Sequence, residues 1–87
     1  MKTIKKQYTV DLAGVRSAKV LHRKIAEALP VPKGYGCNYD ALHDFLTEFG
    51  SGMEIVFVRA SASFSVLRRV CDDAAGETPG LSIAFKS

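Results

Sequence analysis

Residues 53–58 read Met-Glu-Ile-Val-Phe-Val, and this short, nearly continuous apolar stretch decides the fold. A run of this length and composition predicts a strand, and its continuity favours a strand covered on both faces, as in a parallel sheet. Gly50-Ser51-Gly52 stands directly before it and predicts the end of a preceding helix. Parallel strands need long crossover connections, so we expect helices before and after residues 53–58.

The segment before Gly50 has the pattern of an amphipathic helix. Asn38 or Asp40 can cap its amino terminus. Apolar residues recur at the spacing i, i+3, i+4, i+7 and are expected in the core: Leu42, Phe45, Leu46 and Phe49. At about 100° per residue, the opposite side of the helix carries a second set: Asp40, His43, Asp44 and Thr47.

Further upstream, the sequence predicts a strand, a helix and a loop. Residues 3–10 are β-prone and partly alternating. Ser17 can cap a helix that ends where Pro30 and Pro32 follow, and residues 30–37 form an irregular loop. The expected buried residues of the helix are Leu21, Ile25, Ala28 and Leu29. Its expected solvated residues are Lys19, His22, Arg23, Lys24 and Glu27.

Downstream of residues 53–58, the pattern predicts a third helix and a last strand. Ser61 or Ser63 can cap the helix, and Gly76 is its expected end. Its expected inward residues are Phe64, Leu67, Val70, Cys71 and Ala74. Pro79-Gly80 predicts a turn, and residues 81–85 a short strand. The order strand, helix, helix, strand, helix, strand predicts an α/β fold: a three-stranded parallel sheet with about three helices. A chain of this length has room for one core, so residues 1–87 are expected to form a single domain.

The composition is that of a globular protein, with 47% apolar and 24% charged residues. No apolar run approaches the roughly 20 residues that a membrane helix needs. Residues 1–7 lack the apolar stretch of a secretory signal, so we expect a cytoplasmic protein without membrane contact. Cys37 and Cys71 are then expected to be free thiols.

Charge is unevenly distributed along the chain. Residues 1–33 hold eight lysines and arginines against two carboxylates, Asp11 and Glu27. Residues 34–58 hold no lysine or arginine and four carboxylates: Asp40, Asp44, Glu48 and Glu54. The basic third allows one alternative function, a small RNA-binding protein. Scattered surface lysines are the commoner cause of such a charge, so direct nucleic-acid binding is not our main expectation.

Neither a metal site nor a nucleophilic catalytic site is expected. Asp40, His43 and Asp44 could share one helical face as metal ligands, but no other histidine or cysteine can be placed beside them, so neither a metal nor a cofactor is expected. Cys37 could pair with His22 or His43 as nucleophile and base, yet no third group is evident to orient them. We therefore do not expect an enzyme.

Residues 29–47 read Leu-Pro-Val-Pro-Lys-Gly-Tyr-Gly-Cys-Asn-Tyr-Asp-Ala-Leu-His-Asp-Phe-Leu-Thr and resemble the signature of the barstar family of small intracellular ribonuclease inhibitors. The matching positions, without a gap, are Tyr35-Gly36, Asn38, Asp40-Ala41-Leu42, Asp44 and Leu46-Thr47. Leu21-His22 and Ile25 extend the match upstream. The resemblance implies a three-stranded parallel sheet with helices packed on it. It also implies a bacterial immunity protein or antitoxin whose partner is a ribonuclease.

In that family, the loop and the second helix plug the active site of the nuclease, and helix carboxylates take the positions of substrate phosphates. The resemblance implies that Asp44 pairs with a phosphate-binding arginine or lysine, that Asp40 forms a second salt bridge, and that Thr47 hydrogen-bonds at the edge. The other partner-binding residues that it implies are Gly34, Tyr35, Gly36, Asn38, Tyr39 and His43.

This sequence departs from the family pattern at three places. His43 replaces a bulky aromatic residue between the two helix aspartates, and Gly34 replaces an aromatic residue before Tyr35. An acidic residue that the family contributes from a later helix has no clear match, since Ser63 or Phe64 falls near its place. We therefore expect a target nuclease different from that of the founding family member.

Overall fold

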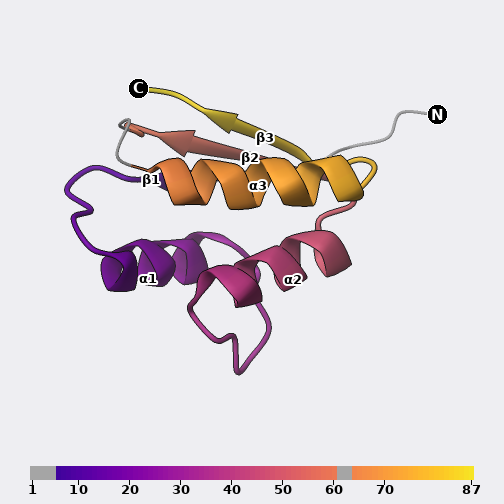
Figure 1. Ribbon diagram of the computed structural model, residues 1–87, viewed down its shortest axis with the longest axis horizontal. Helices are drawn as coiled ribbons and strands as arrows, with labels where there is room; N and C mark the ends of the chain where they lie inside the picture. Colours follow the sequence, from indigo (N-terminus) through magenta and orange to yellow (C-terminus); the bar gives the residue numbers. More distant parts are fainter. Residues whose placement is uncertain (1–5, 61–63) are drawn as a thin grey trace.

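The computed structural model describes residues 6–60 and 64–87, and its elements follow the predicted order (Figure 1). The elements are β1 (Lys6–Asp11), α1 (Ala18–Ala28), α2 (Tyr39–Phe49), β2 (Met53–Val58), α3 (Ser65–Glu77) and β3 (Ser82–Phe85). The α/β fold with a three-stranded parallel sheet and three helices is confirmed. No helix in the described ranges has the length and apolarity needed to cross a membrane.

The sheet has the order β1-β2-β3, and β2 pairs in parallel with both neighbours. Right-handed crossovers that add each new strand on the same side place their helices on one face of the sheet. The helices accordingly lie along one side of it (Figure 1). β2 alternates in burial: Ile55 and Phe57 are buried, whereas Glu54, Val56 and Val58 are partly exposed. The expectation that β2 is covered on both faces is therefore wrong.

The core forms between the inner face of the sheet and the three helices. Leu42 on α2 and Leu67 on α3 are fully buried, as is Ile55 on β2. Phe57 stacks on Phe85 of β3, with ring centroids 4.9 Å apart. The inward stripes predicted for the helices therefore do face this core, except at the positions described next. Of the two free cysteines, Cys71 is part of the core and Cys37 is exposed.

Three sequence-based expectations about the helices are wrong. Phe49 is 49% exposed, because α2 ends there and the chain turns at Gly50 into β2. His22 is only 3% exposed, because it borders the apolar stripe of α1 and the Tyr39 ring covers it. Gly76 does not end α3; it has no left-handed φ, and the helix continues through Glu77.

The start of α3 lies partly outside the described residues. Ser61 and Ser63, the two proposed caps, belong to the undescribed stretch 61–63. In the described structure, Phe64 occupies the N-cap position and makes no side-chain capping hydrogen bond.

An ion pair joins the carboxyl ends of β1 and β2. The Arg59 guanidinium donates to both carboxylate oxygens of Asp11, at 3.0 and 2.5 Å. The hydrogen bonds from Arg59, and then the one from the Ala13 amide, hold the pKa of Asp11 well below its usual range. Both side chains are substantially exposed, so this pair contributes little to the stability of the fold.

Candidate functional site

The loop before α2 is tied to the helix by one side chain, Asn38. Its Oδ1 accepts a hydrogen bond from the Ala41 amide at 2.7 Å, which caps α2, and its Nδ2 donates to the Gly36 carbonyl at 3.3 Å. Gly34 has a φ of 89° and Cys37 a φ of 52°, both in the left-handed region. The loop is therefore a defined turn that Asn38 holds in register with α2.

Replacing Asn38 with alanine should lower the free energy of unfolding by about 1 kcal/mol, because one α2 amide loses its cap and the loop loses its tie. Urea denaturation followed by circular dichroism measures this change. Asn38→Asp keeps the capping oxygen and should recover most of the loss. Equal destabilisation by both substitutions would show that the cap is not what Asn38 contributes.

Two carboxylates project from the exposed side of α2. Asp40 and Asp44 lie one turn apart, and both are exposed. Neither side chain forms a hydrogen bond or ion pair with any residue in the described ranges. These two carboxylates are thus placed side by side with their hydrogen-bonding capacity unused.

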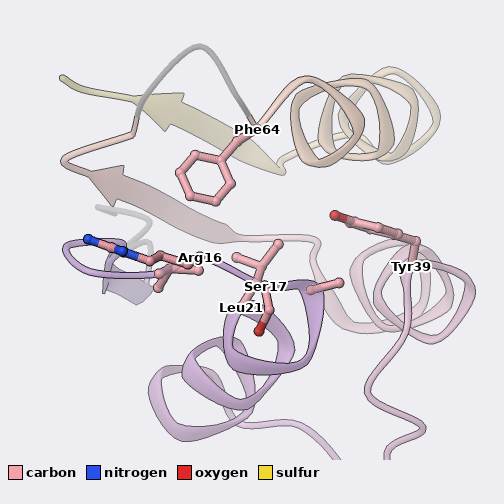
Figure 2. A pocket seen from close by; sticks show the side chains of 7 residues that line it. Arg16, Ser17, Leu21, Tyr39 and Phe64 are labelled. Atoms are coloured by element: carbon pink, nitrogen blue, oxygen red, sulfur yellow. The ribbon is translucent and has the colours of Figure 1, made fainter.

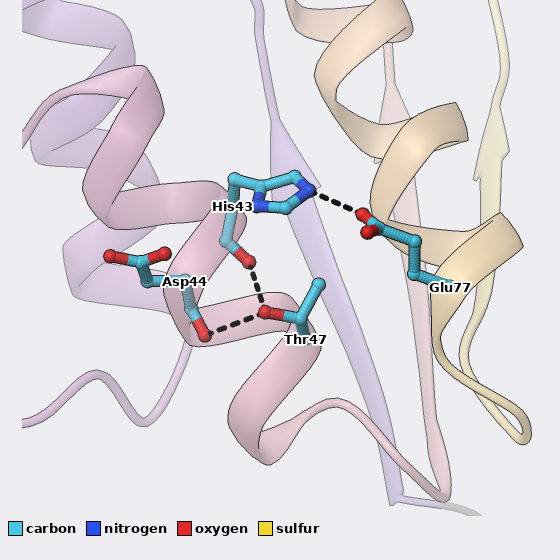
Figure 3. Close-up of polar contacts among 4 residues, drawn as sticks. All are labelled: His43, Asp44, Thr47 and Glu77. Atoms are coloured by element: carbon cyan, nitrogen blue, oxygen red, sulfur yellow. Dashed lines mark hydrogen bonds and ion pairs between the residues drawn. The ribbon is translucent and has the colours of Figure 1, made fainter.

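His43, between the two aspartates, is held by α3. Its Nε2 lies 2.7 Å from Oε2 of Glu77 (Figure 3). An ionised carboxylate only accepts, so Nε2 carries the proton and the other ring nitrogen, Nδ1, is left for another group. About a third of the His43 side chain is exposed, at 35%. The imidazole is therefore fixed in place yet reachable from solvent.

The Thr47 hydroxyl group donates its hydrogen bond within α2. Its Oγ1 donates to the His43 carbonyl at 3.0 Å and lies 3.2 Å from the Asp44 carbonyl (Figure 3). The hydroxyl oxygen still has acceptor capacity. At this surface, Thr47 is therefore better suited to accept a hydrogen bond than to donate one. We call the set Asp40, His43, Asp44, Thr47 and Glu77 the acidic surface.

Glu77 is the member of the acidic surface that sequence reasoning missed. Ending α3 at Gly76 removed Glu77 from the helix and so from any helical face. The apolar stripe of α3 ends at Ala74, and Thr78, although only 5% exposed, is a polar residue at the C-cap. The apolar periodicity of the sequence therefore gave no signal for Glu77.

Tyr35 and Tyr39 are only partly available as contact residues. Both are half-buried and pack against the core. The Tyr35 hydroxyl is buried without a hydrogen-bond partner among the described residues, and burial raises its pKa to about 12. The Tyr39 ring meets His22 edge to face, with centroids 4.6 Å apart. Both tyrosines therefore anchor the loop and the start of α2 to the body of the protein.

His22 lies beneath this anchor and is buried as a neutral group. Its Nδ1 has no hydrogen-bond partner in the described structure, and burial lowers its pKa below the ordinary value of 6.5. Below pH 6.5 the unfolded chain therefore binds a proton that the folded chain resists. Stability that is fully present above this pH is lost as the pH falls from 6.5 toward the folded-state pKa.

We expect the urea midpoint of the protein to fall between about pH 7.5 and pH 5.5 because His22 must stay neutral in the fold. In His22→Leu this decrease should be smaller, whatever the absolute stability of the variant, because leucine does not titrate. A variant whose midpoint falls by as much as that of the wild type over the same interval would rule out His22 as the source.

Within residues 6–60 and 64–87, no group of three or more histidine, cysteine or acidic side chains lies close enough to hold a metal ion. The trio considered from sequence, Asp40, His43 and Asp44, instead directs its imidazole to Glu77.

Comparison with known families agrees with this architecture. A family model described as Barstar (barnase inhibitor) matches residues 5–86. The chain belongs to the barstar family. Comparison with curated proteins gives no match. The barstar match extends well beyond residues 21–47, where the resemblance is visible by eye, and includes α3 and β3.

The structure shows how one departure from the family pattern, His43, is accommodated. In this barstar-family chain the residue between the two aspartates is a histidine, and the neighbouring helix supplies the carboxylate that holds it. α3 therefore places one carboxylate, that of Glu77, beside α2, although the sequence pattern did not identify this residue.

Proposed function

We propose that this protein is a cytoplasmic inhibitor of a ribonuclease, an immunity protein or antitoxin rather than an enzyme. The observation that carries the proposal is the pair Asp40 and Asp44, exposed on one side of α2 without partners in the described structure. Membership of a family described by barnase inhibition supports the same function.

The chemistry of a ribonuclease active site suits such a surface. A site built to hold phosphates presents arginine, lysine and protonated histidine, and carboxylates can meet the same donors in short, charge-assisted hydrogen bonds. An acidic surface also attracts a basic partner and speeds their encounter. The partner is thus expected to be a nuclease with a basic active site, and Asp40 and Asp44 take the place of substrate phosphates.

The rigid attachment of α2 to the core favours binding of the partner. Leu42, Phe45 and Leu46 anchor the helix in the core, and Asn38 fixes its start. A surface that is already ordered loses little conformational entropy when it binds. The two carboxylates therefore meet their partner in a geometry set by folding rather than by binding.

The roles proposed for the individual residues are those that the family resemblance implies, and their exposure on one side of α2 is compatible with them. Asp44 takes the central salt bridge and Asp40 a second one a turn earlier, while Thr47 accepts a hydrogen bond at the edge. His43, held by Glu77, offers its ring face and Nδ1. The loop residues complete the surface: Gly34, Tyr35, Gly36, Asn38 and Tyr39. Gly34 and Gly36 carry no side chain, so the backbone of the loop can approach the partner closely.

RNA binding by the basic N-terminal third is the second candidate function. Arg16, Lys19 and Arg23 are exposed, and none forms an ion pair with a described residue. If this function holds, the isolated protein binds single-stranded RNA with an affinity that falls steeply as salt rises. Fluorescence anisotropy with a labelled RNA at moderate ionic strength measures it; an unchanged signal removes this candidate.

An inhibition assay tests the main proposal. The purified protein is added to barnase and to each small ribonuclease encoded beside its own gene, and RNA cleavage is followed by fluorescence. At least one nuclease should lose its activity at a one-to-one ratio of protein to enzyme. Unchanged cleavage rates across the whole panel would contradict the proposal.

A further inference from the structure

A pocket opens where the amino-terminal ends of all three helices approach one another, beside the carboxyl ends of β1 and β2 (Figure 2). Its volume is about 190 Å³. Val15 and Leu21 come from the start of α1 and the loop before it, Tyr39 is the first residue of α2, and Phe64 caps α3. In open α/β sheets, ligands are commonly bound beyond the carboxyl ends of the strands.

The walls of the pocket combine the rings of Phe64 and Tyr39 with aliphatic side chains and with two polar residues, Arg16 and Ser17. Figure 2 shows the Phe64 ring and the Tyr39 ring reaching toward this space from opposite sides, with Leu21 between them. A cavity of about 150 Å³ is enough to hold benzene. A pocket of about 190 Å³ therefore has room for a six-membered ring.

The pocket shares one residue, Tyr39, with the loop and helix that are expected to bind the partner. Tyr39 forms part of its wall, and the next residue along the chain, Asp40, is the first carboxylate of the acidic surface. The Tyr39 ring also contacts His22 edge to face, with centroids 4.6 Å apart. A partner that contacts both Tyr39 and Asp40 would thus lie close to the opening of the pocket.

We propose that this pocket receives one aromatic side chain, phenylalanine or tyrosine, from the partner protein. This assignment rests on the proposed function, because it takes the occupant from the protein that covers the acidic surface. Aromatic rings favour edge-to-face and offset contacts with other rings, which Tyr39 and Phe64 both offer. The ring acts as an apolar anchor beside the salt bridges and makes the inhibitor selective for nucleases that carry it.

The pocket can be tested without any nuclease. The full-length protein, labelled with ¹⁵N, is titrated with N-acetyl-phenylalaninamide, and amide shifts are followed by NMR. Saturable shifts are expected at Ala18, Leu21 and Tyr39, with a Kd on the order of millimolar for so small a ligand. Absence of saturable shifts at these amides would overturn the proposal.

A variant whose pocket is blocked by a larger side chain tests the assignment, and a variant at the neighbouring position is its control. Ala18 is an exposed pocket-lining residue at the start of α1, and Ala18→Leu places an isobutyl group in the opening. Lys19→Leu adds the same side chain at the next position, which does not line the pocket. The first variant should abolish the ring-dependent shifts and the second should keep them. Both should show the wild-type thermal midpoint within a few degrees.

With a nuclease that the wild type inhibits, Ala18→Leu should raise the Kd roughly tenfold or more, the loss expected when one aromatic side chain is not buried. Lys19→Leu should inhibit the nuclease at the same concentrations as the wild-type protein does. Equal inhibition by Ala18→Leu and wild type would overturn the pocket assignment while the proposed function stands. Conversely, the ring titration remains decisive for the pocket even if the wild type inhibits no nuclease.

Discussion

Asp44→Ala is expected to weaken binding of the nuclease by roughly 10²- to 10⁴-fold. A carboxylate at the centre of a protein interface leaves its cationic partner buried and unpaired when it is removed, which costs about 3–5 kcal/mol. Folding should be almost unaffected, because the Asp44 side chain is exposed and has no partner in the described structure. The free energy of unfolding should change by less than about 0.5 kcal/mol. Isothermal titration calorimetry and urea denaturation measure the two quantities on the same samples.

Two further variants separate charge from general effects. Asp44→Asn keeps the shape of the side chain and removes its charge, so it should also bind weakly. Glu27→Ala removes an exposed carboxylate of α1, outside the acidic surface, and should bind as the wild type does. If Asp44→Ala inhibits as tightly as the wild type, the central role given to Asp44 is wrong.

Leu42→Ala should give the largest loss of stability on the helix that carries the acidic surface. Leu42 is 0% exposed, and truncation of a buried leucine costs about 2–5 kcal/mol through lost apolar burial and the cavity that remains. Such a loss is a large part of the stability of a domain of this size. Urea denaturation followed by circular dichroism measures the difference.

Phe49→Ala is the matched control for Leu42→Ala. Phe49 lies on the same helix and belongs to the same sequence stripe, but it is 49% exposed. Its truncation should therefore cost less than about 1 kcal/mol, as is usual at exposed positions. Equal losses in the two variants would mean that the core does not anchor α2 through Leu42.

Local patterns were sufficient for most of the fold. The apolar run 53–58 marked a strand, and the two candidate caps, Asn38 and Asp40, bracketed the first residue of α2, Tyr39. The stripes of α1 and α2 identified the buried leucines because a helix shows its periodicity within a few turns. Asp40 and Asp44 were placed on the exposed side by the same periodicity.

Features that depend on contacts between distant elements could not be predicted in this way. The pairing of His43 with Glu77 joins residues 34 positions apart, and no local pattern in the sequence indicates it. His22 is buried because Tyr39, from another helix, covers it. The open face of the sheet depends on which side the crossovers pack, a property of the whole topology rather than of the strand.

Competition with a mononucleotide tests most directly whether this protein covers the active site of a nuclease. The Kd of the wild-type protein for an inhibited nuclease is measured with and without a saturating nucleoside monophosphate that occupies the phosphate site. If Asp40 and Asp44 replace substrate phosphates, the apparent Kd rises in proportion to the nucleotide concentration. An apparent Kd that stays unchanged at saturating nucleotide would contradict the account.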